Sequence, residues 1–223
     1  MANEYASVTE LKTWLGISGS DQDASLAIVA AAASRAIDQY CQRRFYADGS
    51  ATARYYTARG GLVETDDIST TTGLVVKYDG DADRTYETTL AADDPTTTGY
   101  QLEPLNADTI HEGQPWWLIR GIGATSFPSH VGGVEVTADW GWPAIPTPIK
   151  QAALVHSASL WVNSGMLQDT EGSPGVQSLS LNGSDSVTFG SLAGIAQAFG
   201  GMVGLSPVVK GLVEPFKRIP RVR

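Results

Sequence analysis

Three histidines and one cysteine are the side chains that could most readily hold a metal ion or supply a nucleophile. His111, His130, His156 and Cys41 form neither a Cys-x-x-Cys pair nor a His-x-x-x-His helix. The sequence therefore predicts no zinc site. It also predicts no catalytic centre, because no nucleophile accompanies His111 or His130. We expect His156 to be structural and Cys41 to behave as a small buried apolar side chain.

Asp79, Asp81 and Asp83 alternate as they do in a calcium-binding loop. An EF-hand loop needs glycine at its sixth position and glutamate at its twelfth, where this sequence has Arg84 and Leu90. We therefore expect a solvated acidic turn, with a weak cation site as the alternative. The sequence contains no phosphate-binding or dinucleotide-binding loop, so no cofactor is expected.

The charge of the chain is unevenly distributed. The formal net charge is −9, but residues 210–223 carry +4, which leaves −13 on the preceding residues. Between Gly60 and Gln114 there are twelve acidic residues and only two basic ones. Because duplex binding depends on Lys and Arg contacts to phosphate, we expect no groove that grips nucleic acid. The sequence has no hydrophobic leader and no run of 18 apolar residues, so we expect cytoplasmic synthesis and no membrane contact.

Two helices are predicted in the N-terminal region, residues 1–51. Ser7 and Glu10 form a capping box that begins a short helix, and Gly16 ends it. A longer helix is predicted from a cap at Ser20 or Asp21 to about residue 43, because apolar side chains recur there at steps of three and four. The side chains expected to pack in this region include Leu11, Trp14, Leu15, Leu26, Val29, Ala33, Ile37, Tyr40 and Phe45.

Residues 52–139 contain short, threonine-rich, β-branched segments separated by turns. Both ends of this region adjoin predicted helices. The sequence therefore predicts an α+β fold, in which a helical core carries an inserted antiparallel β subdomain and an extended C-terminal arm. The predicted strands cover residues 54–57, 74–78, 85–90, 100–103, 116–120 and 134–138.

The stretch Val134–Ile149 converts the last predicted strand into a helix. Apolar residues alternate up to Ala138, Gly141 then interrupts the strand, and Pro148 follows Thr147 as a first helical residue follows its N-cap. The core helix is predicted within residues 140–164. The aromatic and proline side chains expected at this junction and in the core are Trp140, Trp142, Pro148 and Trp161.

The last part of the chain divides into two predicted segments. Residues 165–205 contain a predicted hairpin around Asn182-Gly183, followed by a glycine-rich segment. Residues 206–223 form a basic arm, in which Ser206 and Pro207 begin a short helix.

Four passages carry a resemblance to a known family. The sequence resembles the head-to-tail connector (adaptor) proteins of tailed bacteriophages, which include the connector proteins of long-tailed siphophages. The passages are Tyr5–Leu15, Ala32–Phe45, Val134–Ala152, and Val176–Phe189 followed by Leu212–Arg218.

The resemblance implies a structural virion protein without enzymatic activity, made in the host cytoplasm and located at the neck. Such adaptors form a ring, usually of twelve copies, beneath the portal protein, and they dock a stopper or tail-completion protein below. Genomic DNA passes through the ring without specific binding. An acidic channel wall suits this role, because it repels phosphate.

The resemblance also implies that the C-terminal arm contacts the portal. We expect Phe216 to be its anchor, because burying a phenylalanine contributes about 1.5–3 kcal/mol, whereas an exposed ion pair contributes about 0.2–1 kcal/mol. The residues expected to form the portal-binding arm are Leu212, Val213, Phe216, Lys217, Arg218, Arg221 and Arg223.

Two other classes of function remain open from the residues alone. One is a non-enzymatic carbohydrate- or protein-binding module, in which tryptophans of the β region form a stacking platform. The other is a small hydrolase that uses His111 or His130 with a nearby acid, although its nucleophile is not identifiable.

Overall fold

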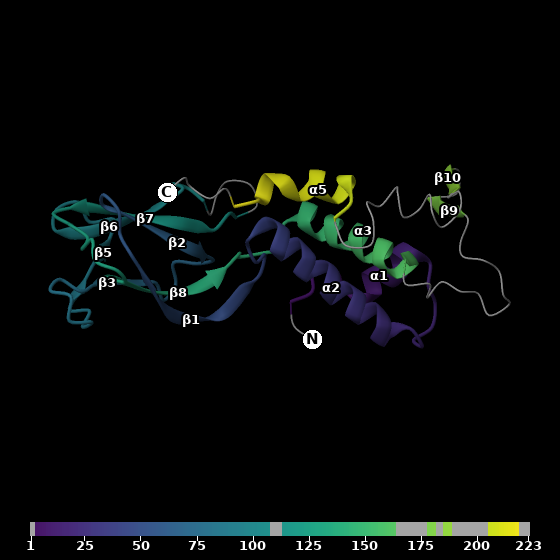
Figure 1. The fold of residues 1–223 in the computed structure, drawn as a ribbon, viewed down its shortest axis with the longest axis horizontal. Helices are drawn as coiled ribbons and strands as arrows, with labels where there is room; N and C mark the ends of the chain where they lie inside the picture. The colour runs from purple at the N-terminus through teal and green to yellow at the C-terminus, as the bar shows by residue number, and fades with distance from the viewer. Residues whose placement is uncertain (1–2, 108–112, 164–177, 182–184, 189–204, 219–223) are drawn as a thin grey trace. The chain divides into compact units, whose positions relative to one another are not determined.

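The computed structural model describes residues 3–107, 113–163, 178–181, 185–188 and 205–218. The chain forms two compact units, which we call the helical unit (Met1–Arg43 with Pro146–Arg223) and the β unit (Arg44–Ile145). In the order of the chain, the strands of the β unit follow the second helix and precede the third, and Figure 1 shows both units. The predicted α+β architecture with an inserted β region is confirmed. The β unit is wider than residues 52–139, because its first strand begins at Ala47.

The helical unit is built on two long helices, α2 (Asp23–Cys41) and α3 (Thr147–Asn163), which pack side by side (Figure 1). The shorter helices α1 (Val8–Leu15) and α5 (Pro207–Val213) each contact α3. A 3-10 turn, η1 (Glu214–Phe216), follows α5 directly. Among the helices that the structure describes, none has the length and apolar composition needed to cross a bilayer.

The ends of these helices follow local sequence signals only in part. α1 has the predicted capping box, and Gly16 ends it with a left-handed φ of 68°. The predicted cap of α2 was wrong, since the helix begins at Asp23 and the preceding Gln22 makes no side-chain capping bond. Asp23 instead pairs with Lys12 Nζ at 2.8 Å, and its carboxylate lies near the positive end of the helix dipole. α3 already begins at Thr147, the residue predicted as its cap.

The β unit is an eight-stranded sheet in the order β4-β3-β8-β2-β7-β6-β5, with β1 also paired to β8. One pair, β5 with β6, is parallel, so the sheet is mixed and not purely antiparallel. The strands are β1 (Ala47–Tyr56), β2 (Leu62–Ile68), β3 (Val75–Tyr78), β4 (Thr88–Thr89), β5 (Ala91–Ala92), β6 (Thr98–Glu103), β7 (Trp116–Gly123) and β8 (Val134–Gly141).

Two strands differ most from the prediction. β2 was missed because its sequence, LVETDDI, contains three acids that conceal the alternation of strand residues. Asp66 of β2 accepts hydrogen bonds from Arg54 Nη1 at 2.7 Å and from the Tyr56 hydroxyl at 3.1 Å, so partners on β1 compensate its charge. The strand predicted over residues 85–90 shrinks to the two residues of β4.

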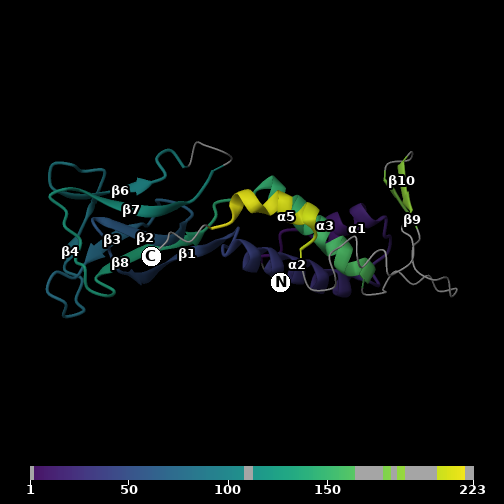
Figure 2. The ribbon, with the colours of Figure 1, turned by 45° about the horizontal axis from the view of Figure 1, so that its top comes forward.

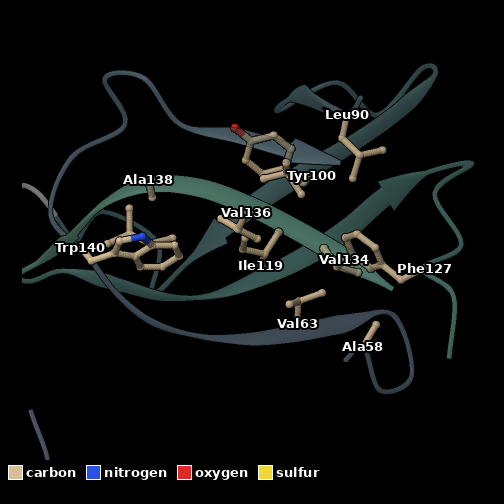
Figure 3. Close-up of a cluster of buried hydrophobic side chains, with 12 residues drawn as sticks. Ala58, Val63, Leu90, Tyr100, Ile119, Phe127, Val134, Val136, Ala138 and Trp140 are labelled. Atoms are coloured by element: carbon tan, nitrogen blue, oxygen red, sulfur yellow. The ribbon is translucent and has the colours of Figure 1, made fainter. Parts of the chain in front are cut away.

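The core of the β unit lies on one face of the central strand β8. Val134, Val136, Ala138 and Trp140 alternate along β8, and all four are buried. Figure 3 shows them beside Ile119 of β7 and residues of the neighbouring strands. The alternation predicted for this strand from the sequence therefore corresponds to burial.

Gly141 ends β8 where β1 begins on the facing strand. Its φ is +116°, and a Cβ placed there would lie 1.9 Å from the carbonyl oxygen of Tyr46. Only glycine fits this position. Beyond it, the Trp142 ring contacts Phe45 with centroids 5.1 Å apart, and Trp142 Nε1 donates to Asp67 at 3.1 Å. Both aromatics are buried, as predicted for the junction.

A second, two-stranded sheet belongs to the helical unit. β9 (Ser178–Leu181) and β10 (Asp185–Thr188) pair antiparallel, with Leu179 opposite Val187. This is the predicted hairpin. The helical spacing noted in the glycine-rich segment that follows lies outside the described residues.

Candidate functional site

The C-terminal segment, residues 205–218, belongs to the region that is predicted to bind a partner protein. Ser206 caps α5 by accepting from the Val209 N–H at 3.3 Å, and Pro207 occupies the first turn. α5 lies along α3 in both views of the fold (Figures 1 and 2). Leu205, Val209 and Val213 are buried, so this segment is docked on the helical unit and is not an extended arm.

The end of this segment is fastened to the last turn of α2. The Arg218 N–H donates to the Cys41 carbonyl at 2.9 Å, one of the helix-end carbonyls that otherwise lack a helical partner. The Tyr40 hydroxyl donates to the Glu214 carboxylate. The Lys217 ammonium lies 4.6 Å from the centre of the Tyr40 ring, a cation–π distance.

Cys41 lies beneath this contact. Its side chain is fully buried, and its Sγ lies 3.7 Å from the Val213 carbonyl oxygen, to which it donates. Burial raises the pKa of the Cys41 thiol to about 12, so it is unreactive while the segment is docked. The hydrogen bond to Glu214 raises the pKa of Tyr40.

The residues predicted for the portal-binding arm differ in their exposure to solvent. Val213 is wholly buried against the chain's own helices, so it is unavailable to a partner while the segment is docked. Leu212, Phe216 and Arg218 are half-buried, and Lys217 is exposed. Arg221 and Arg223 lie outside the described residues.

The other predicted core and junction residues also differ in their exposure to solvent. Ile37, Phe45, Trp140, Trp142 and Trp161 are buried. Tyr40 and Pro148 are half-buried. Trp14 is 44% exposed, contrary to expectation, because Leu11 alone in α1 is buried.

The acidic turn differs from its prediction at one residue. Asp79 is fully buried, and its carboxylate accepts from the N–H groups of Asp81, Ala82 and Arg84 at 2.7–3.2 Å. Burial by itself raises the pKa of Asp79, but these bonds and nearby His130 outweigh it, and the pKa is lowered.

Carboxylates of Asp79, Asp81, Asp83 and Glu87 lie within 4.8 Å of one another, a spacing that a cation could bridge. The Asp79 carboxylate oxygens already accept hydrogen bonds from backbone N–H groups of the turn, and this explains why a carboxylate is buried there. The arrangement therefore stabilises a turn and does not by itself indicate a metal centre.

The two histidines that the structure describes, His130 and His156, lie in different units and form no common site. His111 lies outside the described residues. His130 Nε2 lies 3.4 Å from Asp79 Oδ2, and His156 is buried on α3, where burial lowers its pKa. Of the tryptophans considered for a stacking platform, Trp140, Trp142 and Trp161 are at most 3% exposed and unavailable to a ligand, whereas Trp116 and Trp117 of β7 are half-buried.

Comparison with known proteins bears on the N-terminal half of this architecture. Residues 5–88, which contain α1, α2 and the first strands of the β unit, match the family described as phage gp6-like head-tail connector protein. Over these residues the chain is similar to the head-tail connector family. The resemblance read from the sequence is therefore confirmed. No curated protein sequence matches the chain.

The fold of this chain is also found in a solved assembly. A chain in the structure titled "Neck of empty GTA particle computed with C6 symmetry" aligns with a TM-score of 0.53 and 19% sequence identity. The alignment covers 96% of this chain and 90% of that chain. At this identity the likeness establishes the shared fold, including the inserted β unit.

The net charge of the chain is concentrated in one unit. Residues 44–145 contain fifteen acidic and six basic side chains, whereas the helical unit contains nine of each. The whole net charge of −9 therefore resides in the β unit, and the helical unit is neutral.

Proposed function

We propose that this protein is a head-tail connector, a structural virion protein of the neck that assembles as a ring beneath the portal and acts as a head-to-tail adaptor. The observation that carries the proposal is the family match over residues 5–88, supported by a fold shared along 96% of the chain with a neck protein. The ring comprises twelve copies, a number compatible with the C6 symmetry of that neck structure. It extends the DNA channel and docks the next neck or tail protein.

The charge distribution supports the passage of DNA without binding. An acidic β unit repels phosphate, and the helical unit is neutral in sum. We propose no catalytic role, since the family is structural and the described histidines lie in structural settings.

We propose that the portal contacts the C-terminal segment through its exposed side. Phe216 is only partly buried in the free chain, so at most about 70 Å² of its side chain can still be covered by a partner, an area that corresponds to about 1.8 kcal/mol. Lys217, Arg218, Arg221 and Arg223 then guide the encounter, because charges at an interface act mainly on its rate and register. Val213 is left out of this contact because it is buried.

The test is negative-stain imaging and a binding titration of the portal protein from the same particle with this connector. We expect an added ring on the portal with the wild-type chain and a loss of affinity of about tenfold or more for Phe216→Ala. Ile28→Ala is the matched control, because Ile28 is an apolar side chain that is 66% exposed and lies on α2, outside the C-terminal segment. No added ring above micromolar concentrations would refute the adaptor role, and equal affinity of Phe216→Ala and wild type would refute the anchor alone.

A further inference from the structure

β1 is a long open edge of the β unit. It pairs with β8 along one side, and within the described part of the chain no strand pairs along its other side. The strands at the two ends of the sheet, β4 and β5, have two residues each, whereas β1 has ten. Natural proteins shorten, charge or cover edge strands because an open edge recruits further strands. β4 and β5 follow this rule by their length. β1 is longer; its register against β8 shifts between Ala47 and Ala51, and the Asp48 carboxylate there pairs with Arg44 and Arg54, so the regular part of its open edge begins at Ala51.

The open section of β1 is Asp48–Ala53, where six consecutive residues are exposed. Four of them are Gly or Ala or Ser, so small side chains leave the backbone accessible. Beyond Ala53, the bonds from Arg54 and Tyr56 to Asp66 cover the strand from the side of β2. Two backbone groups of the section are already used, since Gly49 N–H donates to Asp139 and the Thr52 carbonyl accepts from Trp140 Nε1.

The hairpin β9–β10 is the element that we consider as a partner for the β1 edge. Its strands pair with each other and with no further strand among the described residues. A hairpin of two strands is marginally stable in water and gains stability from a third strand. Each of its strands has four residues, which fits within the six-residue open section of β1.

We propose that the β9–β10 hairpin of one copy adds to the Asp48–Ala53 edge of a second copy. The contact is heterologous, because each copy offers its hairpin to one neighbour and its β1 edge to the other. Such contacts close into a ring, whereas a self-complementary contact would stop at a dimer. The inference rests on the proposed function only in that a ring brings the copies together.

The test uses two single-cysteine additions, Ala51→Cys and Ser180→Cys, on chains with different affinity tags. Cys41 stays in place, because it is buried and its thiol pKa is about 12. The two chains are mixed, assembled on the portal and treated with a short bismaleimide. A crosslink that carries both tags can form only between copies. Val131→Cys mixed with Ser180→Cys is the control, because Val131 is 75% exposed and is not part of β1.

We expect the Ala51–Ser180 mixture to give at least tenfold more two-tag dimer than the control. We also expect amide exchange at residues 48–53 and 178–188 to slow at least tenfold on assembly. If rings form but the two mixtures crosslink equally, the pairing is wrong and the adaptor role stands. If an Ala51→Cys/Ser180→Cys double variant crosslinks only within one chain, the hairpin occupies its own β1 edge and the inference is likewise overturned. If wild type adds no ring to the portal, the proposed function itself fails.

Discussion

The docking of the C-terminal segment predicts how fast the single cysteine reacts. Val213→Ala removes two carbon atoms from a fully buried side chain. At about 0.8 kcal/mol for each buried CH₂, the lost transfer free energy is about 1.6 kcal/mol, and the cavity raises the total to roughly 2 kcal/mol. Since about 1.4 kcal/mol is a factor of ten, the population in which the segment is undocked should rise roughly tenfold to thirtyfold.

The assay is the reaction of Cys41 with an aromatic disulfide under native conditions, followed by absorbance. The thiol is covered by Val213 and reacts only after the segment opens, so the rate should rise by the same tenfold to thirtyfold. Val208→Ala is the matched control, because Val208 is 65% exposed and its truncation should change the rate less than twofold. A weak urea dependence of the rate separates local opening from global unfolding. An unchanged rate in Val213→Ala would refute the docking geometry.

Three further predictions concern stability. The Lys150 hydrogen bond and the capping box lower the pKa of Glu10 to about 2, so the contribution of Glu10 to stability is present above pH 4.5 and is lost as the pH falls towards 2. Lys150→Gln should therefore make the melting temperature depend less on pH between these values. An unchanged pH profile would contradict the assignment. Gly141→Ala should cost about 3 kcal/mol or prevent folding, measured by urea denaturation, because its methyl group meets a carbonyl oxygen at 1.9 Å. Asp79→Ala should lower the melting temperature measurably while exposed Asp81→Ala should not, because only Asp79 accepts three backbone bonds; equal melting temperatures would contradict this.

The sequence predicted local features well and long-range ones poorly. The capping box of α1 and the alternation of β8 depend on residues within a few positions, and both are present. The fastening of the C-terminal segment was missed, because it joins Tyr40 to Glu214 across 174 positions and no local pattern encodes such a bond. β2 was missed because its acids resemble a loop until Arg54 is placed beside them.

The candidate site illustrates the same limit. The family resemblance implied a portal-binding arm over residues 206–223, and Ser206 with Pro207 correctly predicted its helix. The composition could not reveal that Val213 faces inward, since the helix is too short for its apolar spacing to distinguish an internal face from an external one.

The pairing of β1 with β8 has a consequence for how this chain can change over evolutionary time. Ala47 lies opposite Gly141, so the points where the chain enters and leaves the β unit are neighbours, about 5 Å apart as in any antiparallel pair. The residues between Ala47 and Gly141 can be regarded as an exchangeable cassette whose two ends are adjacent. Its excision needs only a short linker, and a gene encoding the helices could exchange one such cassette for another without redesigning the helical core.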